Sequence, residues 1–179
     1  MLWADRNLGA TCPEDVGEYF AWGELEPKYV YSWDTYRFGN SGETMTKYTE
    51  NTRLDPEDDI AHVLLGGKWR MPTEAEVAAL YAAYYPLVTE DATINGVSGH
   101  MLRGKNEYEG KSLFFPFGGY ISKEKYIDKG FRCCLWVANK SGDPGKGIIR
   151  MLMPVNQGNL GVGYWSLYYG ANIRPVCDK

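Results

Sequence analysis

The sequence holds few residues of the types that catalyse reactions or bind metals, and its four cysteines are the first candidates. Cys12, Cys133, Cys134 and Cys177 show no C-x-x-C spacing, so they do not form the usual metal or redox motif. Cys133 and Cys134 follow Arg132, and a neighbouring cation lowers the pKa of a thiol. On a strand, however, adjacent side chains point to opposite faces, and neighbouring residues rarely reach the separation of a disulfide. This pattern disfavours a paired catalytic thiol and leaves the redox compartment open.

Histidines and carboxylates give no catalytic or metal-binding pattern. His62 and His100 are the only histidines, and neither belongs to a zinc-ligand spacing. The acidic run Asp55-Pro56-Glu57-Asp58-Asp59 is dense enough in oxygens for calcium, but we interpret it as the start of a helix. Neither a Ser-His-Asp arrangement nor a phosphate-binding glycine loop is recognisable. We therefore expect no metal, no cofactor and no catalytic residue.

Aromatic residues gather in the last third of the chain, and they are the strongest candidates for binding. The members are Trp136, Tyr164, Trp165, Tyr168 and Tyr169. We expect Trp136 in the core, and we expect Tyr164 and Trp165 on a loop because they follow Gly161-Val162-Gly163. Tyrosine and tryptophan offer wide contact at low entropy cost, so binding loops favour them. Such rings suit a protein or a glycan ligand equally well.

Composition excludes several classes of partner. The chain has 179 residues and a net charge of −4, with no basic stripe for a nucleic-acid backbone or an anionic membrane. No apolar run approaches the roughly 20 residues of a membrane-spanning helix. The charged Asp5 follows Met1 too closely for a signal peptide. We therefore expect no nucleic acid as partner and no membrane span in this chain.

Two helices and several strands are predicted, which indicates an α+β fold. The first helix runs from the Asp55-Pro56 start to Leu65, before Gly66-Gly67. The second begins at a Thr73–Glu76 capping box and is expected to end near Tyr85. The predicted strands are Val97–Met101, Lys111–Phe117, Arg132–Ala138, Ile148–Pro154 and Asn172–Val176. Turns are predicted at 141–145 and 157–159.

Five sequence strings, spread in order along the chain, resemble a known family. They are Leu2 to Ala10, Pro13 to Glu24, Trp69 to Glu76, Gly118-Gly119-Tyr120 and Tyr168 to Val176. The chain is similar to the Fibrobacter-type major paralogous domain found in surface proteins of gut bacteria. More distantly, it resembles the formylglycine-generating-enzyme-like branch of the C-type-lectin fold.

The resemblance implies one C-type-lectin-like domain over residues 1–179, with two helices, short antiparallel strands and long irregular loops. Its scaffold would cover residues 2–119, its ligand-binding or variable region 131–172, and its first and last strands would lie together. It also implies the extracellular space or cell surface of a bacterium, with the leader or anchor outside this chain. Arg174 is expected to hold the chain end to a buried carboxylate. The calcium-binding motifs of C-type lectins are absent, since Glu26-Pro27-Lys28 places a cation where a ligand would be, so binding is expected to be calcium-independent.

The chain departs from the family at positions that we expect to be exposed, near Leu135-Trp136-Val137-Ala138, Leu167 and Ala171-Asn172. A matching framework with differing surface positions is typical of a binding surface diversified by a retroelement, although ordinary drift produces the same pattern. The predicted ligand-binding residues are Arg132, Cys133, Cys134, Leu135, Tyr164, Trp165, Leu167, Tyr168 and Asn172.

The sequence therefore predicts a non-catalytic, receptor-like or adhesin-like binding domain. Two alternatives stay open. The Trp69 to Glu76 string resembles the signature of formylglycine-generating enzymes, which suggests a copper or thiol oxidase using Cys133 and Cys134. Alternatively, the same surface contacts a neighbouring copy in an adhesive fibre, as a structural subunit.

Overall fold

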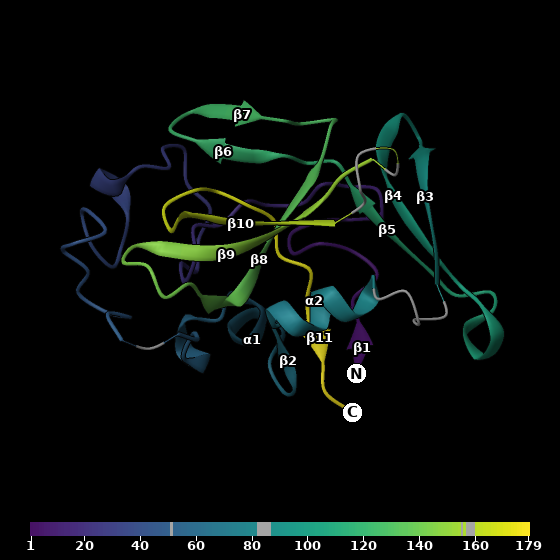
Figure 1. Ribbon diagram of the computed structural model, residues 1–179, viewed down its shortest axis with the longest axis horizontal. Coiled ribbons are helices and arrows are strands. Elements are labelled where there is room, and N and C mark those ends of the chain that lie inside the picture. The colour runs from purple at the N-terminus through teal and green to yellow at the C-terminus, as the bar shows by residue number, and fades with distance from the viewer. Residues whose placement is uncertain (51, 82–86, 155, 157–159) are drawn as a thin grey trace.

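The protein has an α+β fold built from two short helices and several small antiparallel sheets (Figure 1). The structure, a computed structural model, describes residues 1–50, 52–81, 87–154, 156 and 160–179. The helices are α1 (Ile60–Leu65) and α2 (Glu74–Leu80), with 3₁₀ turns at Trp33–Thr35, Pro56–Asp58 and Asn106–Tyr108. None of the helices among the described residues is long and apolar enough to cross a membrane.

Within the part of the chain that the structure describes, the strands form four small sheets. The first joins the termini in the order β1 (Leu2–Trp3), β11 (Val176–Cys177) and β2 (Trp69–Arg70). The second orders β10 (Leu160–Ser166), β9 (Lys146–Leu152) and β8 (Cys133–Lys140). The third orders β3 (Leu87–Ile94), β4 (Val97–Gly104) and β5 (Ser112–Pro116), and β6 (Tyr120–Ser122) pairs with β7 (Lys125–Ile127) as a hairpin. Figure 1 shows this hairpin above β9 and β10, with both chain ends below the helices.

The second predicted helix is confirmed at its start. Thr73 Oγ1 accepts a hydrogen bond from the Glu76 N–H, and the Glu76 carboxylate accepts one from the Thr73 N–H, which completes the capping box. The helix ends at Leu80, with Tyr81 as its C-cap. The predicted end near Tyr85 lies outside the described residues.

The first predicted helix begins later than expected. Asp55 precedes only a 3₁₀ turn, and α1 starts after Asp59, whose carboxylate accepts hydrogen bonds from the Ala61 and His62 N–H groups. The same carboxylate accepts a hydrogen bond from the Met71 N–H at 2.8 Å. Burial raises the pKa of Asp59, against the opposing effect of these backbone donors. The contact with Met71 fixes Asp59 as the helix cap.

Two strand predictions need correction. Residues 160–166, of which Tyr164 and Trp165 were expected on a loop, form the edge strand β10, paired with β9 over its whole length. The final strand is shorter than predicted, because β11 covers only Val176–Cys177. Asn172 instead forms an isolated parallel bridge with Leu135. The turn predicted at 157–159 lies outside the described residues.

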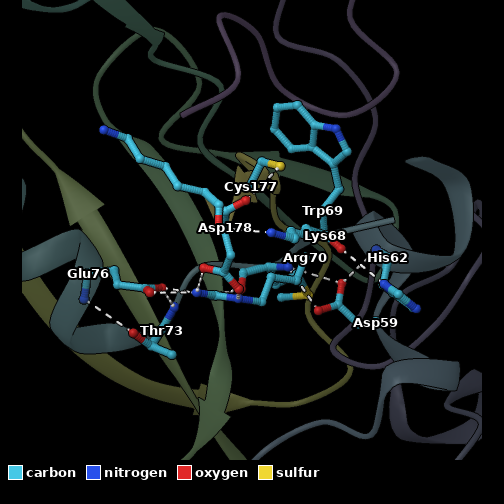
Figure 2. A network of polar contacts seen from close by, with 11 residues as sticks. Asp59, His62, Lys68, Trp69, Arg70, Thr73, Glu76, Cys177 and Asp178 are labelled. Carbon is cyan, nitrogen blue, oxygen red and sulfur yellow. Dashed lines mark hydrogen bonds and ion pairs between the residues drawn. The ribbon is translucent and has the colours of Figure 1, made fainter. Parts of the chain in front are cut away.

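The C-terminal end of the chain is paired with β1 and bound by Arg70, whose contacts Figure 2 shows. β1 pairs with β11, so the expectation that the first and last strands lie together is confirmed. Arg70 on β2 forms bidentate contacts to Glu76 on α2, at 2.9 and 2.7 Å, and to Asp178, at 3.0 and 2.7 Å. One guanidinium therefore links the capping box of α2 to the end of the chain.

A second arginine, Arg174, is fully buried. Its guanidinium donates to Asn7 Oδ1 at 2.8 Å, to the Phe114 carbonyl at 2.7 Å and to the Ala4 carbonyl at 3.2 Å. It also lies 4.3 Å from the centroid of the Phe115 ring. Arg174 does join the chain ends, but through an amide and carbonyls rather than the buried carboxylate that was expected.

We expect Glu76→Gln to lower the free energy of unfolding by about 1 kcal/mol at neutral pH, because the ion pair with Arg70 is lost. Glutamine still completes a capping box, so the change isolates the charge. Arg70 lowers the pKa of Glu76, and its contribution is therefore present above the ordinary glutamate pKa of about 4.3 and disappears as the pH falls through the lower folded-state value. Urea unfolding of both proteins across this range measures the effect, with the exposed Glu107→Gln as control. A difference that persists unchanged in acid would contradict the assignment.

Candidate functional site

Five of the nine predicted ligand-binding residues lie in the core and are fully buried, namely Cys133, Cys134, Leu135, Leu167 and Asn172. The expectation that they are exposed is wrong. β8 is paired on both edges, because Cys133 bridges Gly119 and Leu135 bridges Asn172 on the side away from β9. Both faces of β8 are also covered. These residues therefore belong to the core and not to an exposed surface.

The two faces of β8 pack against different parts of the protein. Cys134 and Trp136 face a cluster with Trp22, which confirms Trp136 as a core residue. Cys133 and Leu135 face a separate cluster that contains Leu80, Leu102 and Phe115. The prediction that Cys133 and Cys134 point to opposite faces is confirmed.

Neither cysteine has the environment of a reactive thiol. Burial raises the pKa of Cys133 to about 12 and that of Cys134 well above its ordinary value. The thiolate is the form that attacks electrophiles and binds metals, and both sites disfavour it. Arg132 lowers the pKa of Cys134, but by less than burial raises it.

Asn172 shows how the core supports the region around it. Its backbone N–H donates to the Cys134 carbonyl and its own carbonyl accepts from the Trp136 N–H, at 3.2 and 3.1 Å. Its side-chain amide donates to the Glu18 carbonyl at 2.9 Å. These contacts join the C-terminal segment to β8 and to the N-terminal half, so Asn172 has a structural role.

The remaining four predicted residues are accessible. Tyr164 is 55% exposed, whereas Arg132, Trp165 and Tyr168 are half-buried. Since side chains alternate along a strand, Tyr164 and Trp165 point to opposite faces of β10. Trp165 packs on the side of Cys134 and Trp136, and Tyr168 packs against the same core cluster. The structure therefore brings Trp165 and Tyr168 together and separates Tyr164 from them.

Trp165 and Tyr168 belong to a continuous row of half-buried rings that we call the aromatic strip. Its members, in order of contact, are Trp165, Tyr120, Tyr169, Tyr168 and Trp33. Successive ring centroids lie 4.4, 5.4, 4.7 and 5.2 Å apart. The first two contacts are tilted, and the last two are edge-on, an arrangement that aromatic pairs prefer.

Backbone pairing positions the aromatic strip. Tyr120 lies on β6, whose next residue, Ile121, forms an antiparallel bridge with Gly170. The Tyr169 carbonyl accepts a hydrogen bond from Trp136 Nε1 at 3.1 Å. Tyr168 and Tyr169 follow Leu167 in the turn between the end of β10 and this bridge. The strip thus stands on rigid elements, which lowers the entropy lost on binding.

Glycine 163 makes room for Trp165. A Cβ atom at Gly163 would lie 2.6 Å from Trp165 Nε1 and 3.1 Å from Ile149 Cγ2. The indole therefore lies along the strand over a position that has no side chain. The Gly-x-Gly pattern that suggested a loop instead serves the packing of this ring.

An ion pair lies near Tyr120. Arg132 Nε is 3.1 Å from Asp128 Oδ2, and Arg132 NH1 is 3.5 Å from Met151 Sδ. Burial raises the pKa of Tyr120, and Asp128 adds to this effect while Arg132 opposes it. Burial and then the hydrogen bond with Tyr169 raise the pKa of Tyr168 to about 12. The raised pKa values keep both phenols neutral at physiological pH.

Three carboxylates of the acidic run form ion pairs with a lysine. Side-chain oxygens of Asp55, Glu57 and Asp58 lie within 4.8 Å of one another. Lys47 Nζ contacts all three, at 2.9, 3.3 and 2.5 Å, and Arg37 lies 3.2 Å from Asp58. The earlier interpretation as helix capping holds only for Asp59, and the other three carboxylates are neutralised by Lys47 and Arg37.

Sequence reasoning missed Trp33, Tyr120 and Asp128. Tyr120 was assigned to the scaffold string Gly118-Gly119-Tyr120, and Trp33 lies more than a hundred residues before its partner Tyr168. No local pattern indicates such a contact.

Comparison of the chain with protein-family models, with curated proteins and with solved structures found no match.

In the native protein we expect a thiol reagent to modify Cys12 and Cys177 and to leave Cys133 and Cys134 unmodified, because both are buried with raised pKa values. Labelling with a disulfide reagent, followed by peptide mass spectrometry with and without denaturant, measures this. The two half-buried cysteines serve as internal controls. Rapid native modification of Cys133 or Cys134, or stoichiometric binding of copper by them, would revive the oxidase alternative.

Proposed function

We propose that this protein is a non-catalytic binding domain, receptor-like or adhesin-like, that recognises a protein or glycan through the aromatic strip and Arg132. The observation that carries the proposal is the strip itself, five contiguous half-buried rings from β6, β10, the turn after β10 and the 3₁₀ turn Trp33–Thr35. Clustered tyrosine and tryptophan rings supply most of the binding energy at many interfaces. Arg132 adds a partly exposed charge beside Tyr120.

We further propose that the fold is C-type-lectin-like and that the domain acts outside the cell or on the surface of a bacterium. The paired termini, two short helices and a strand-rich second half are in keeping with this fold. The family resemblance supplies the proposed location. In this proposal, calcium is not required, since the acidic cluster is occupied by Lys47.

The two alternatives are less well supported. An oxidase would need accessible thiolates, whereas Cys133 and Cys134 are buried on opposite faces. A structural subunit of an adhesive fibre would place a second copy against the aromatic strip. Sedimentation of the purified protein distinguishes it, because a fibre subunit forms concentration-dependent assemblies that a strip substitution abolishes.

Substitutions in the strip test the proposed surface. Protein and glycan arrays identify a ligand for the wild-type protein, and we expect Trp165→Ala and Tyr168→Ala each to weaken its binding by about tenfold or more, because each removes a contact ring. Trp165→Phe retains a ring and is expected to recover part of the affinity. Tyr164→Ala is the control, since Tyr164 points to the other face of β10. Unchanged binding in both alanine variants, with native circular dichroism, would exclude the strip as the binding surface.

Variation among isolates tests whether this surface is diversified. If a retroelement rewrites it, we expect the codons of the accessible Arg132, Trp165 and Tyr168 to vary at positions where a near-copy template has adenine, with that template and a reverse transcriptase gene nearby. The codons of the buried Cys133, Leu135 and Leu167 are expected to stay constant, because substitutions there would open cavities. Sequencing the 3′ end of the gene across isolates measures this. Equal variation in residues 131–172 and 2–119 would indicate drift instead.

A further inference from the structure

A groove of about 640 Å³ lies between the loop that carries Tyr29 and the β6–β7 hairpin. Its lining residues come from three separate segments of the chain. They are Glu18, Pro27, Lys28, Tyr29, Ile121, Glu124 and Tyr126. None of them belongs to the aromatic strip.

The pairing of the hairpin places the groove and the strip on opposite sides of it. Ile121 is directly opposite Tyr126 in the β6–β7 register, so both point to the same face. Tyr120, the neighbour of Ile121, points to the other face, where it contacts Trp165. The hairpin therefore separates the two surfaces, with the aromatic strip on one face and the groove on the other.

Two exposed tyrosine rings line the groove. Tyr29 is 95% exposed and Tyr126 is 57% exposed. Tyr126 is held by an edge contact with Tyr19, at 5.5 Å between centroids, and by Lys129 Nζ, 4.8 Å from its ring centroid. It also lines a neighbouring cleft of about 500 Å³. Its ring therefore stands between two hollows, which gives room for a chain of several small units.

The loop that carries Tyr29 is fastened at both sides. Tyr31 and Lys123 exchange backbone hydrogen bonds at 2.9 and 2.8 Å, which ties the loop to the turn of the hairpin. The Tyr31 hydroxyl donates to the Tyr19 carbonyl at 2.5 Å. Lys28 Nζ contacts Glu24 at 2.7 Å and donates to the Thr35 carbonyl at 2.8 Å. The backbone on both sides of Tyr29 is thus held in place without a ligand.

The charges of the groove favour a ligand rich in hydroxyl groups. Glu18 and Glu124 are exposed, and among the described residues no ion pair is found for either. The Lys28 ammonium is already engaged by Glu24. The groove therefore offers two carboxylate acceptors beside two aromatic faces, and these carboxylates disfavour an anion bound next to them.

We propose that this groove binds a neutral oligosaccharide, with Tyr29 and Tyr126 stacking on sugar rings and Glu18 and Glu124 accepting hydrogen bonds from sugar hydroxyls. A sugar ring presents C–H groups to an aromatic face and hydroxyls at its edge, which matches this combination. The site is separate from the aromatic strip and does not depend on the ligand of the strip.

The test uses the whole protein on an array of neutral cello-, xylo-, manno- and malto-oligosaccharides, with uronic-acid and sulfated oligosaccharides beside them. For each neutral oligosaccharide that binds the protein on the array, the affinity is then measured by calorimetric titration. We expect Tyr29→Ala and Tyr126→Ala each to weaken binding by about tenfold or more. Tyr164→Ala is the matched control, since Tyr164 is 55% exposed, close to the 57% of Tyr126, but lies on β10.

Loss of neutral oligosaccharide binding in both groove variants, with the Tyr164→Ala protein unchanged, supports the proposal. The proposal is overturned if the wild-type protein retains no neutral oligosaccharide, if it prefers acidic ones, or if either groove variant binds as tightly as the wild type. Substitutions in the strip are expected to leave this binding unchanged. A failure of the groove therefore remains distinguishable from a failure of the strip.

Discussion

The hydrogen bonds of the buried Arg174 guanidinium hold the two ends of the chain against β5. The guanidinium binds the N-terminal segment through Asn7 and Ala4 and binds β5 through Phe114. Burial lowers its pKa to about 10, so it remains charged at neutral pH in an environment that disfavours charge. A buried charge of this kind is tolerated only where it is hydrogen-bonded, and here each of the three guanidinium nitrogens donates to one oxygen, two of them carbonyls and one an amide. The segments that supply these oxygens are thereby held in one arrangement.

This arrangement explains why the middle of β8 is unsuitable for ligand contact. With the C-terminal segment held beside it, β8 gains a partner on the edge away from β9, and Asn172 pairs with Leu135 there. Both faces are then covered by core clusters. The proposed recognition is therefore assigned to elements at the periphery of the sheet, namely the β6–β7 hairpin, the turn after β10 and the edge strand itself.

Sequence reasoning succeeded where the determinants were local. The capping box of Thr73 and Glu76 lies within one turn, and it was placed correctly. The start of the helix before it was predicted wrongly. Its cap is Asp59, whose carboxylate is held in part by the Met71 N–H, twelve residues away. Leu135 and its neighbours were expected at the surface on family comparison, although the unbroken apolar run from Cys133 to Ala138 is itself typical of a strand buried on both faces. The partners of Trp165 could not be predicted, since Tyr120 reaches it only through the pairing of the hairpin.

The alternation of side chains in the short β6–β7 hairpin has a larger effect on the surface than its length suggests. Tyr120 and Tyr126 come from one hairpin, but they point to opposite sides, one into the aromatic strip and the other into the groove. Gly119, with a φ of +65°, has no room for a Cβ atom, which would lie 2.1 Å from the Ile127 carbonyl oxygen. A side chain here would displace the hairpin from its position against Tyr31 and Gly170, and both surfaces would change together. The backbone at Gly119 therefore determines the positions of both the strip and the groove, whereas the side chains of one surface can be substituted without changing the other.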